Sequence, residues 1–190
     1  MKELEEKILR DGQIINNDII KVDSFLNHQI DVGLFKRFAD EVKTHFKDKK
    51  IDKILTIETS GIPVAFAIAE ALDNIPLVFA KKSQSAITGD ESFIKEIKSF
   101  TRNTISHVRV SKKYIKADEN ILIVDDFLAE GNAASGLAEI CKLGGAHVVG
   151  VAVMIEKGFQ HGRDKLVKQG IDVFSGAVIK EFRDNKPVFE

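Results

Sequence analysis

Two adjacent carboxylates, Asp125 and Asp126, follow an unbroken apolar run, and their type and position suggest chemistry more clearly than any other residues of the sequence. The run, Ile121 to Val124, is β-branched apart from Leu122, which is typical of a strand buried on both faces of a parallel sheet. Carboxylates that end such a strand accept hydrogen bonds well from a vicinal diol. The pattern therefore predicts a sugar ligand at the carboxyl end of this strand.

A loop containing Gly131 and an Ala-rich helical stretch, residues 133–143, come directly after the acids. A helix N-terminus offers unpaired backbone N–H groups and the positive end of the helix dipole, which favour a phosphate. A strand, a glycine loop and a helix start thus predict a phosphate beside the sugar diol.

Two other interpretations fit the acids alone. They could be solvated loop residues, since loops are rich in Asp for local reasons. They could also hold Mg²⁺ in a nucleotide hydrolase, but that class requires G-x-x-x-x-G-K-[ST]. Gly131 and Gly136 have the required separation, whereas Leu137 stands where the lysine should be.

The motif resembles that of a known family. The stretch from Ile121 to Gly131 is similar to the motif by which type I phosphoribosyltransferases bind 5-phospho-α-D-ribose 1-diphosphate (PRPP). It has, in order, four apolar residues, two acids, two further residues, a small residue, a variable residue and the glycine. Other stretches resemble the bacterial xanthine branch of that family, in chain order: Ile20–Asp23, Phe25–Asp31, Ile54–Glu58, Ser60–Ile62, Phe79–Lys82 and Glu156–Phe159. The resemblance covers nearly the whole chain. It implies an α/β fold with a central parallel sheet of about five strands flanked by helices, and a small hood lobe.

The resemblance also implies an activity, the conversion of xanthine and PRPP to xanthosine 5'-monophosphate and diphosphate in purine salvage, and therefore a pentosyltransferase. Asp125 and Asp126 would be the catalytic diol clamp. Mg²⁺ would be bound with PRPP and held mainly by the substrate and water, with no metal site made by the protein alone. The remaining PRPP contacts would come from the loop after the acids and from the first strand's loop with a lysine: Ala129, Glu130, Gly131, Asn132, Ala133, Ser60, Gly61 and Lys81.

For the purine, Lys157 can donate to an exocyclic oxygen and Phe159 can stack on the ring. A solvated lysine and a core phenylalanine are the alternatives. Ile20 and Asn27, from the hood, are implied as xanthine contacts by the resemblance alone.

The reaction would displace diphosphate at C1 of the sugar through an oxocarbenium-like transition state, with catalysis from positioning and from neutralising the leaving group. Hypoxanthine-guanine relatives have an Asp where this chain has Ala129, so no general base stands out; we hypothesise that xanthine reacts as its anion. Glu130 also departs from the family pattern. A negative charge about 4 Å from the phosphate would cost on the order of 4 kcal/mol, so we predict that the Glu130 side chain faces solvent while its N–H binds.

Composition narrows the class of protein. At 190 residues and 44% hydrophobic, the chain suits one domain, and its net charge of −1 without a basic tail argues against nucleic-acid or membrane-surface partners. Cys141 is the only cysteine, and Met1 to Arg10 are charged throughout. We therefore expect a cytoplasmic protein, and the resemblance suggests a homodimer.

Periodicity predicts alternating strands and helices and hence a doubly wound parallel sheet. Strands are expected at 53–58, 76–81, 121–124, 147–155 and 171–178. A short charged helix that Gly12 can terminate is expected to carry Leu4, Ile8 and Leu9 on one face. Further helices are expected from Asp31 as the cap, from about Pro63 to Leu72, at 133–143 and at 164–169. The hood lobe is assigned mainly to residues 1–35, and the polar stretch 83–106 is interpreted as a mobile lid.

Other functions remain open at this point. The chain could act on guanine or hypoxanthine, or less readily on adenine, whose exocyclic group is itself a donor. A PRPP-sensing regulator is a further alternative, although such a protein needs a DNA-binding domain ahead of the motif, and only about 50 residues precede the first sheet strand.

Overall fold

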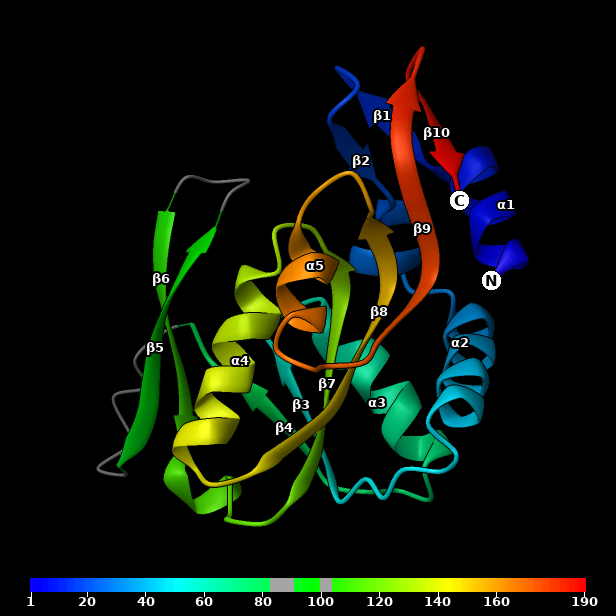
Figure 1. The fold of residues 1–190 in the computed structure, drawn as a ribbon. Coiled ribbons are helices and arrows are strands. Elements are labelled where there is room, and N and C mark those ends of the chain that lie inside the picture. The colour runs from blue at the N-terminus through cyan, green and yellow to red at the C-terminus, as the bar shows by residue number, and fades with distance from the viewer. Residues whose placement is uncertain (83–90, 100–103) are drawn as a thin grey trace.

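A computed structural model describes residues 1–82, 91–99 and 104–190 of the chain. Strands and helices alternate around one central sheet (Figure 1). The helices are α1 Lys2–Asp11, α2 Val32–His45, α3 Gly61–Ala71, α4 Asn132–Leu143 and α5 Gly162–Val167, with a π-helical turn η1 Asp23–Asn27 and a 3-10 turn η2 Lys112–Tyr114. The strands are β1 Gln13–Ile15, β2 Ile19–Lys21, β3 Lys53–Ile57, β4 Leu77–Ala80, β5 Ser92–Ser99, β6 Thr104–Ser111, β7 Asn120–Leu128, β8 His147–Lys157, β9 Val173–Arg183 and β10 Lys186–Phe189.

The central sheet has the strand order β10-β9-β8-β7-β3-β4. Strands β9, β8, β7, β3 and β4 are parallel to their neighbours, and β10 joins the edge antiparallel. The five parallel strands confirm the expected class. Strand β10 was not predicted: it returns from β9 through Asp184 and Asn185, whose positive φ angles of 50° and 53° suit a tight hairpin turn.

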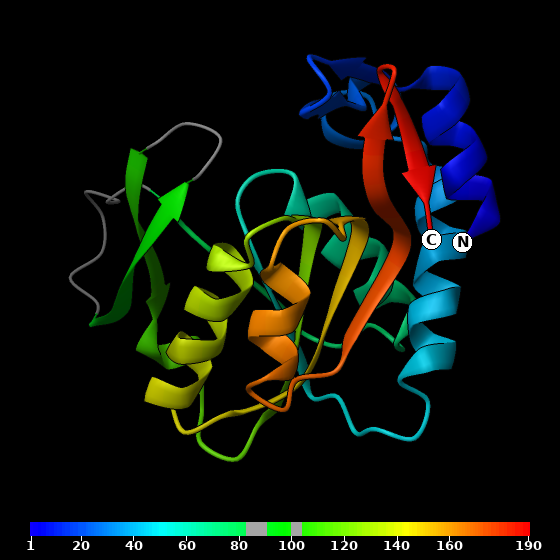
Figure 2. The ribbon, with the colours of Figure 1, turned by 45° about the horizontal axis from the view of Figure 1, so that its top comes forward.

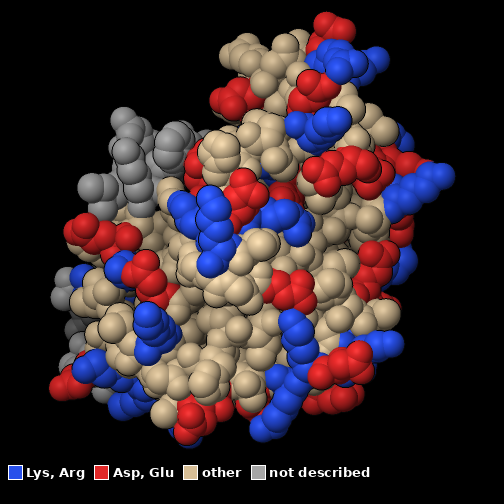
Figure 3. All heavy atoms as spheres, viewed as in Figure 1, with Lys and Arg blue, Asp and Glu red and all other residues tan. Residues whose placement is uncertain are grey.

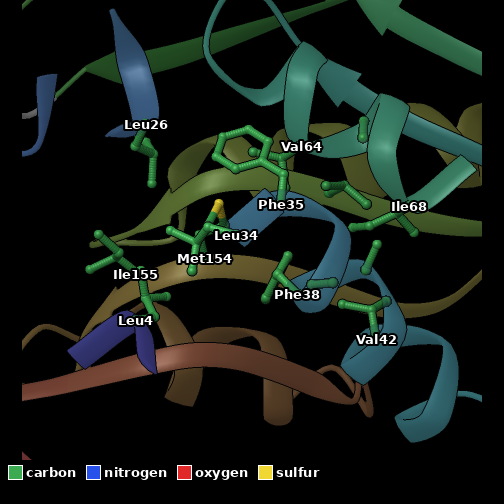
Figure 4. Packing of buried hydrophobic residues seen from close by; sticks show 14 of the residues in the cluster. Leu4, Leu26, Leu34, Phe35, Phe38, Val42, Val64, Ile68, Met154 and Ile155 are labelled. Atoms are coloured by element: carbon green, nitrogen blue, oxygen red, sulfur yellow. The ribbon is translucent and has the colours of Figure 1, made fainter. Parts of the chain in front are cut away.

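The apolar run of β7 feeds two cores, one on each face of the sheet. Leu122 and Val124 pack in a cluster with α1, α2 and α3 (Figure 4), whereas Ile121 and Ile123 pack in a cluster with α4 and the β5–β6 pair. Alternate residues of a strand point to opposite faces, so a strand covered on both faces must be apolar at every position. Figure 2 shows α2 and α3 on one side of the sheet and α4 and α5 on the other.

The helix predictions hold in outline. Asp31 caps α2, because its Oδ1 accepts from the backbone N–H of Leu34 at 3.0 Å. In α1, Leu4 and Ile8 are buried, but Leu9 is 55% exposed, so its predicted place on the buried face was wrong. Cys141 is buried in α4, as its apolar surroundings predicted.

Three strands are longer than periodicity indicated. β7 runs on through both acids to Leu128, β8 reaches Lys157 and β9 reaches Arg183. Polar residues ended the predicted strands, yet pairing continues, since Asp125 aligns with Val153 and Leu128 with Glu156. The acid pair therefore lies within the end of β7, where a strand fixes it more rigidly than a loop.

The lid predicted over residues 83–106 lies partly outside the described residues. Its described part belongs to an antiparallel pair, β5 and β6, in register from Ser92 with Ser111 to Ser99 with Thr104. Ile97 and Val108 are buried in the second core cluster, beside α4. The alternation of Val108 and Val110 around Arg109 predicts a return strand where β6 lies, but β5 was not predicted because polar residues dominate its sequence.

Both ends of the chain meet at the hood. The β1–β2 hairpin and the β9–β10 hairpin lie side by side in both ribbon views (Figures 1 and 2), and their turns exchange hydrogen bonds. The N–H of Asn185 donates to Asn17 Oδ1 at 2.7 Å, and the N–H of Asn17 donates to Asn185 Oδ1 at 3.1 Å. The hood is thereby tied to an edge of the sheet.

Positive and negative side chains are interspersed over the face seen in Figure 3, in keeping with the net charge of −1. Among the described residues, no helix is long and apolar enough to cross a membrane.

Candidate functional site

A cleft of about 670 Å³ opens at the carboxyl ends of β3, β4 and β7. Ligands of open α/β sheets bind at this edge. The acid pair of β7, the loop after it and the first turn of α4 form one wall. The full lining is Asn27, Ile57, Glu58, Thr59, Ser60, Lys82, Ile97, Ser106, Val108, Asp125, Asp126, Phe127, Leu128, Ala129, Glu130, Gly131, Asn132, Ala133 and Ala134.

Asp125 is a buried carboxylate, only 7% exposed. Its Oδ1 accepts from the backbone N–H of Asp126 at 2.9 Å, and Asp126 Oδ1 accepts from the N–H of Phe127 at 3.0 Å. Burial raises the pKa of Asp125 well above its ordinary value, and the neighbouring charge of Asp126 raises it further. These hydrogen bonds hold each carboxylate in one orientation, while the half-buried Asp126 stays accessible from the cleft.

Because Gly61 has no side chain, there is room beside it for the carboxylate of Asp125. A Cβ at this position would lie 2.3 Å from Thr56 Oγ1 and 2.9 Å from Asp125 Oδ1. Gly61 itself is buried at the start of α3 and is not among the residues that line the cleft, whereas Ser60 is. The glycine therefore acts on the site through packing against Asp125.

The loop from Ala129 to Ala133, called the phosphate loop below, leads into α4. Gly131 is the N-cap of α4 with φ +72°, a left-handed conformation that favours glycine. A Cβ on Gly131 would lie 2.9 Å from the Cα of Gly162, so α5 packs directly against the loop. Asn132, Ala133 and Ala134, the first residues of α4, line the same cleft as the acids, at the positive end of the helix dipole.

The β3 and β4 ends supply the opposite wall. Glu58 Oε1 accepts from the backbone N–H of Lys82 at 2.5 Å, which ties the two strand ends together. Lys82 lines the cleft. Lys81 instead pairs through its backbone with Arg109, and its Nζ lies 5.9 Å from the centre of the Phe79 ring. Sequence alone could not decide which of two adjacent lysines reaches the site.

The four residues implied as purine contacts do not come together in the cleft. Asn27 lines it, whereas Ile20 is buried in the first core cluster. Lys157 Nζ donates to the carbonyl of Asp18 in the β1–β2 turn at 2.8 Å, and burial lowers its pKa. Phe159 is 40% exposed and makes an edge contact with Phe182, with the ring centres 5.4 Å apart. Lys157 and Phe159 thus lie at the hood side of β8.

Sequence analysis missed several residues that line the cleft. Lys82, Ile97, Ser106 and Val108 had no assigned role, and the last three come from the β5–β6 pair. Alternation of apolar residues around Arg109 was a signal for β6, but only the pairing of β6 with β5 and α4 brings those residues to the cleft.

The acids of the cleft fit a magnesium ion that a substrate carries. No group of three or more His, Cys, Asp or Glu that could hold a metal occurs among residues 1–82, 91–99 and 104–190. Mg²⁺ commonly keeps its waters and binds one or two carboxylates together with substrate phosphates. Asp125, Asp126 and Glu58 line the cleft and could supply such oxygens.

Five parallel strands, an acid pair at the end of the middle one and a glycine loop leading into a helix define an α/β protein with a candidate ligand site at the carboxyl edge of its sheet. Comparison with known families gives the same result, since residues 21–181 match the family model described as "Phosphoribosyl transferase domain". The chain belongs to the phosphoribosyltransferase family.

Similar sequences span the whole chain. The protein named xanthine phosphoribosyltransferase from Clostridium tetani is 47% identical to this chain, and the match covers 100% of each chain. The protein of the same name from Clostridioides difficile is 50% identical, and the match covers 99% of this chain and 98% of the relative. Solved structures share the fold. Adenine phosphoribosyltransferase from Saccharomyces cerevisiae has a TM-score of 0.74 at 23% identity, covering 92% of this chain and 99% of that one. The enzyme from Rhodothermus marinus has a TM-score of 0.75 at 18% identity, covering 94% and 100%.

Proposed function

We propose that this protein is a xanthine phosphoribosyltransferase, which converts xanthine and PRPP to xanthosine 5'-monophosphate and diphosphate in purine salvage. The observation that carries the proposal is the meeting of the acid pair, the phosphate loop and the β3 loop in one cleft. Full-length relatives at 47–50% identity bear this name, which supports xanthine over the other purines.

Each part of PRPP has a matching wall. The N–H groups of the phosphate loop bind the 5'-phosphate, and Asp125 and Asp126 accept from the ribose hydroxyls. The diphosphate lies along Thr59 and Ser60, close to the start of α3. Lys82 lines the cleft and Lys81 does not, so we assign the cation nearest the diphosphate to Lys82.

Catalysis follows from this placement. Two fixed carboxylates beside the ribose stabilise positive charge that develops on the sugar as the bond from C1 to diphosphate breaks. The ring nitrogen of the purine, held in line with that bond, then attacks C1. Ile97 and Val108 narrow the cleft from the β5–β6 side and limit the access of water, which is the role we propose for this lid.

Mg²⁺ would bind with PRPP at Asp125, Asp126 or Glu58 and would offset the charge of the diphosphate. Asn27 would contact the purine from the hood. Contacts of Lys157 and Phe159 with the purine remain part of the proposal. They require Lys157 to exchange its bond to the Asp18 carbonyl for one to the base.

The test is an assay of the purified protein with PRPP, Mg²⁺ and one purine at a time. We expect xanthosine 5'-monophosphate and diphosphate with xanthine, and slower turnover with guanine and hypoxanthine. Turnover of adenine alone would contradict the proposal. PRPP binding without turnover of any base would instead favour a PRPP-sensing regulator.

We further propose a cytoplasmic homodimer. Phe66 of α3 and Val32 of α2 are 65% and 62% exposed, and burying such apolar side chains against a second copy would favour association. Light scattering after gel filtration would give about twice the chain mass of 21.1 kDa, and a single-chain mass would rule the homodimer out.

A further inference from the structure

Lys165 of α5 lies outside the cleft and forms hydrogen bonds to the phosphate loop. Lys165 Nζ donates to the carbonyl of Glu130 at 2.9 Å and to Asn132 Oδ1 at 2.9 Å. These acceptors flank Gly131, so the ammonium bridges the left-handed turn of the loop. Lys165 is not among the residues that line the cleft.

The helix that carries Lys165 has a fixed position. Arg163 donates to Glu156 through Nε at 2.8 Å and through Nη2 at 2.5 Å, and Glu156 is only 2% exposed. A Cβ on Gly162 would lie 2.2 Å from the carbonyl oxygen of Ala129, so α5 and the loop are in close backbone contact. An ion pair at one side and backbone packing at the other therefore leave the Lys165 backbone little freedom.

The bond to the Glu130 carbonyl orients a peptide group. Because a trans peptide is planar, holding this carbonyl toward α5 turns the N–H of Gly131 to the opposite side. Gly131 lines the cleft, and the proposed function places the 5'-phosphate of PRPP there.

We propose that Lys165 is a positioning residue for the 5'-phosphate of PRPP. It orients the Glu130–Gly131 peptide so that the Gly131 N–H faces the phosphate. The inference rests on the proposed function for its ligand. It concerns the affinity for PRPP and leaves the purine contacts untouched.

The test compares Lys165→Met with Lys165→Arg and with a control, Lys168→Met, in steady-state kinetics. Lys168 is exposed, follows α5 directly, and no hydrogen bond from its side chain to the loop occurs in the described part of the chain. We expect Lys165→Met to raise the KM for PRPP about three- to tenfold, as for the loss of one charge-assisted hydrogen bond at an exposed site. The KM for xanthine and kcat should stay within about twofold. Lys165→Arg should restore most of the PRPP affinity, and Lys168→Met should match the wild type.

The inference is overturned if Lys165→Met leaves the KM for PRPP unchanged, raises both KM values equally, or behaves like Lys168→Met. A wild-type protein that turns over no purine would defeat the proposed function instead. Calorimetric titration of the same variants with PRPP and Mg²⁺ would then test Lys165 alone, and equal dissociation constants would overturn its role.

Discussion

At the scale of single residues, Asp125 is required by the proposed chemistry, but its burial makes the fold less stable. Burial raises the pKa of Asp125, so the folded state prefers the protonated form. For an acid with a raised pKa in the folded state, the folded state binds more protons than the unfolded state, and stability falls as pH rises from the ordinary value of 3.8 to the raised one. At any pH well above 3.8, burial of the Asp125 carboxyl therefore lowers the free energy of unfolding.

Asp125→Asn should raise the free energy of unfolding at pH 7 and reduce kcat/KM for PRPP by at least a hundredfold. The amide Oδ1 can still accept from Asp126 N–H, so the geometry is kept. Urea denaturation at several pH values checks the sign: the gain should grow as pH rises above 3.8 and disappear below it. A variant that is less stable than the wild type at pH 7 would contradict this account of Asp125.

Gly61→Ala tests the packing behind the acid. The added Cβ would meet Thr56 Oγ1 and Asp125 Oδ1, so the variant should lose about 1–3 kcal/mol of stability and bind PRPP more weakly. Thr56 is buried and its Oγ1 has no hydrogen-bond partner in the described structure. Thr56→Ala in the same chain should therefore restore part of both losses, measured by thermal unfolding and calorimetry. No rescue would mean that Gly61 acts through its backbone conformation.

At the scale of elements, the sequence predicted most of what periodicity encodes. The apolar run of Ile121 to Val124 required a strand covered on both faces, and the structure has it. The predicted strands ended too early. Hydrophobicity predicted that the strand ends before Asp125 and Asp126, but β7 continues through both acids because it stays paired with β8. The β5 strand was interpreted as part of an irregular lid because polar residues dominate it, whereas Val108 and Val110, which alternate with Arg109, predicted a return strand where β6 lies.

The position of helix α5 depends on the ion pair between Arg163 and the buried Glu156. The contribution of this pair to the free energy of unfolding can be measured. Arg163→Met leaves the Glu156 carboxylate buried beside Ser175 and should cost about 2–4 kcal/mol in urea denaturation. The matched control is Arg37→Met, which breaks the exposed pair with Glu3 and should cost less than about 1 kcal/mol. Adding Glu156→Gln to Arg163→Met should recover part of the loss. Equal costs for the two arginines would contradict a buried role for this pair.

At the scale of the whole molecule, the hood depends on residues 168 positions apart. No local pattern could join the Asn17 turn to the Asn185 turn, and so sequence analysis assigned the hood to the N-terminal segment without the β9–β10 hairpin. The same limit explains why Lys82 was passed over for Lys81: the register of β4 in the sheet, and not its composition, decides which lysine faces the cleft. The order of the motifs along the chain was sufficient to predict the family and the wall of the cleft that β7 and the phosphate loop form.

Changing both turn residues to glycine tests whether this tie holds the hood over the site. Glycine keeps the positive φ angles of Asn17 and Asn185 but removes both side-chain hydrogen bonds. We expect Asn17→Gly with Asn185→Gly to raise the KM for xanthine about threefold or more while leaving the KM for PRPP unchanged, since Asn27 contacts the cleft from the hood. Each single change removes only one of the two bonds and should therefore have a smaller effect than the double change. An equal rise in both KM values would show a general loss of structure.

The most direct measurement is a crystal structure of the protein soaked with PRPP and Mg²⁺. The account predicts the ribose hydroxyls within hydrogen-bond distance of Asp125 and Asp126, and the 5'-phosphate against the N–H groups of residues 129–133. PRPP bound elsewhere on the molecule, or a cleft that stays empty at saturating PRPP, would contradict it.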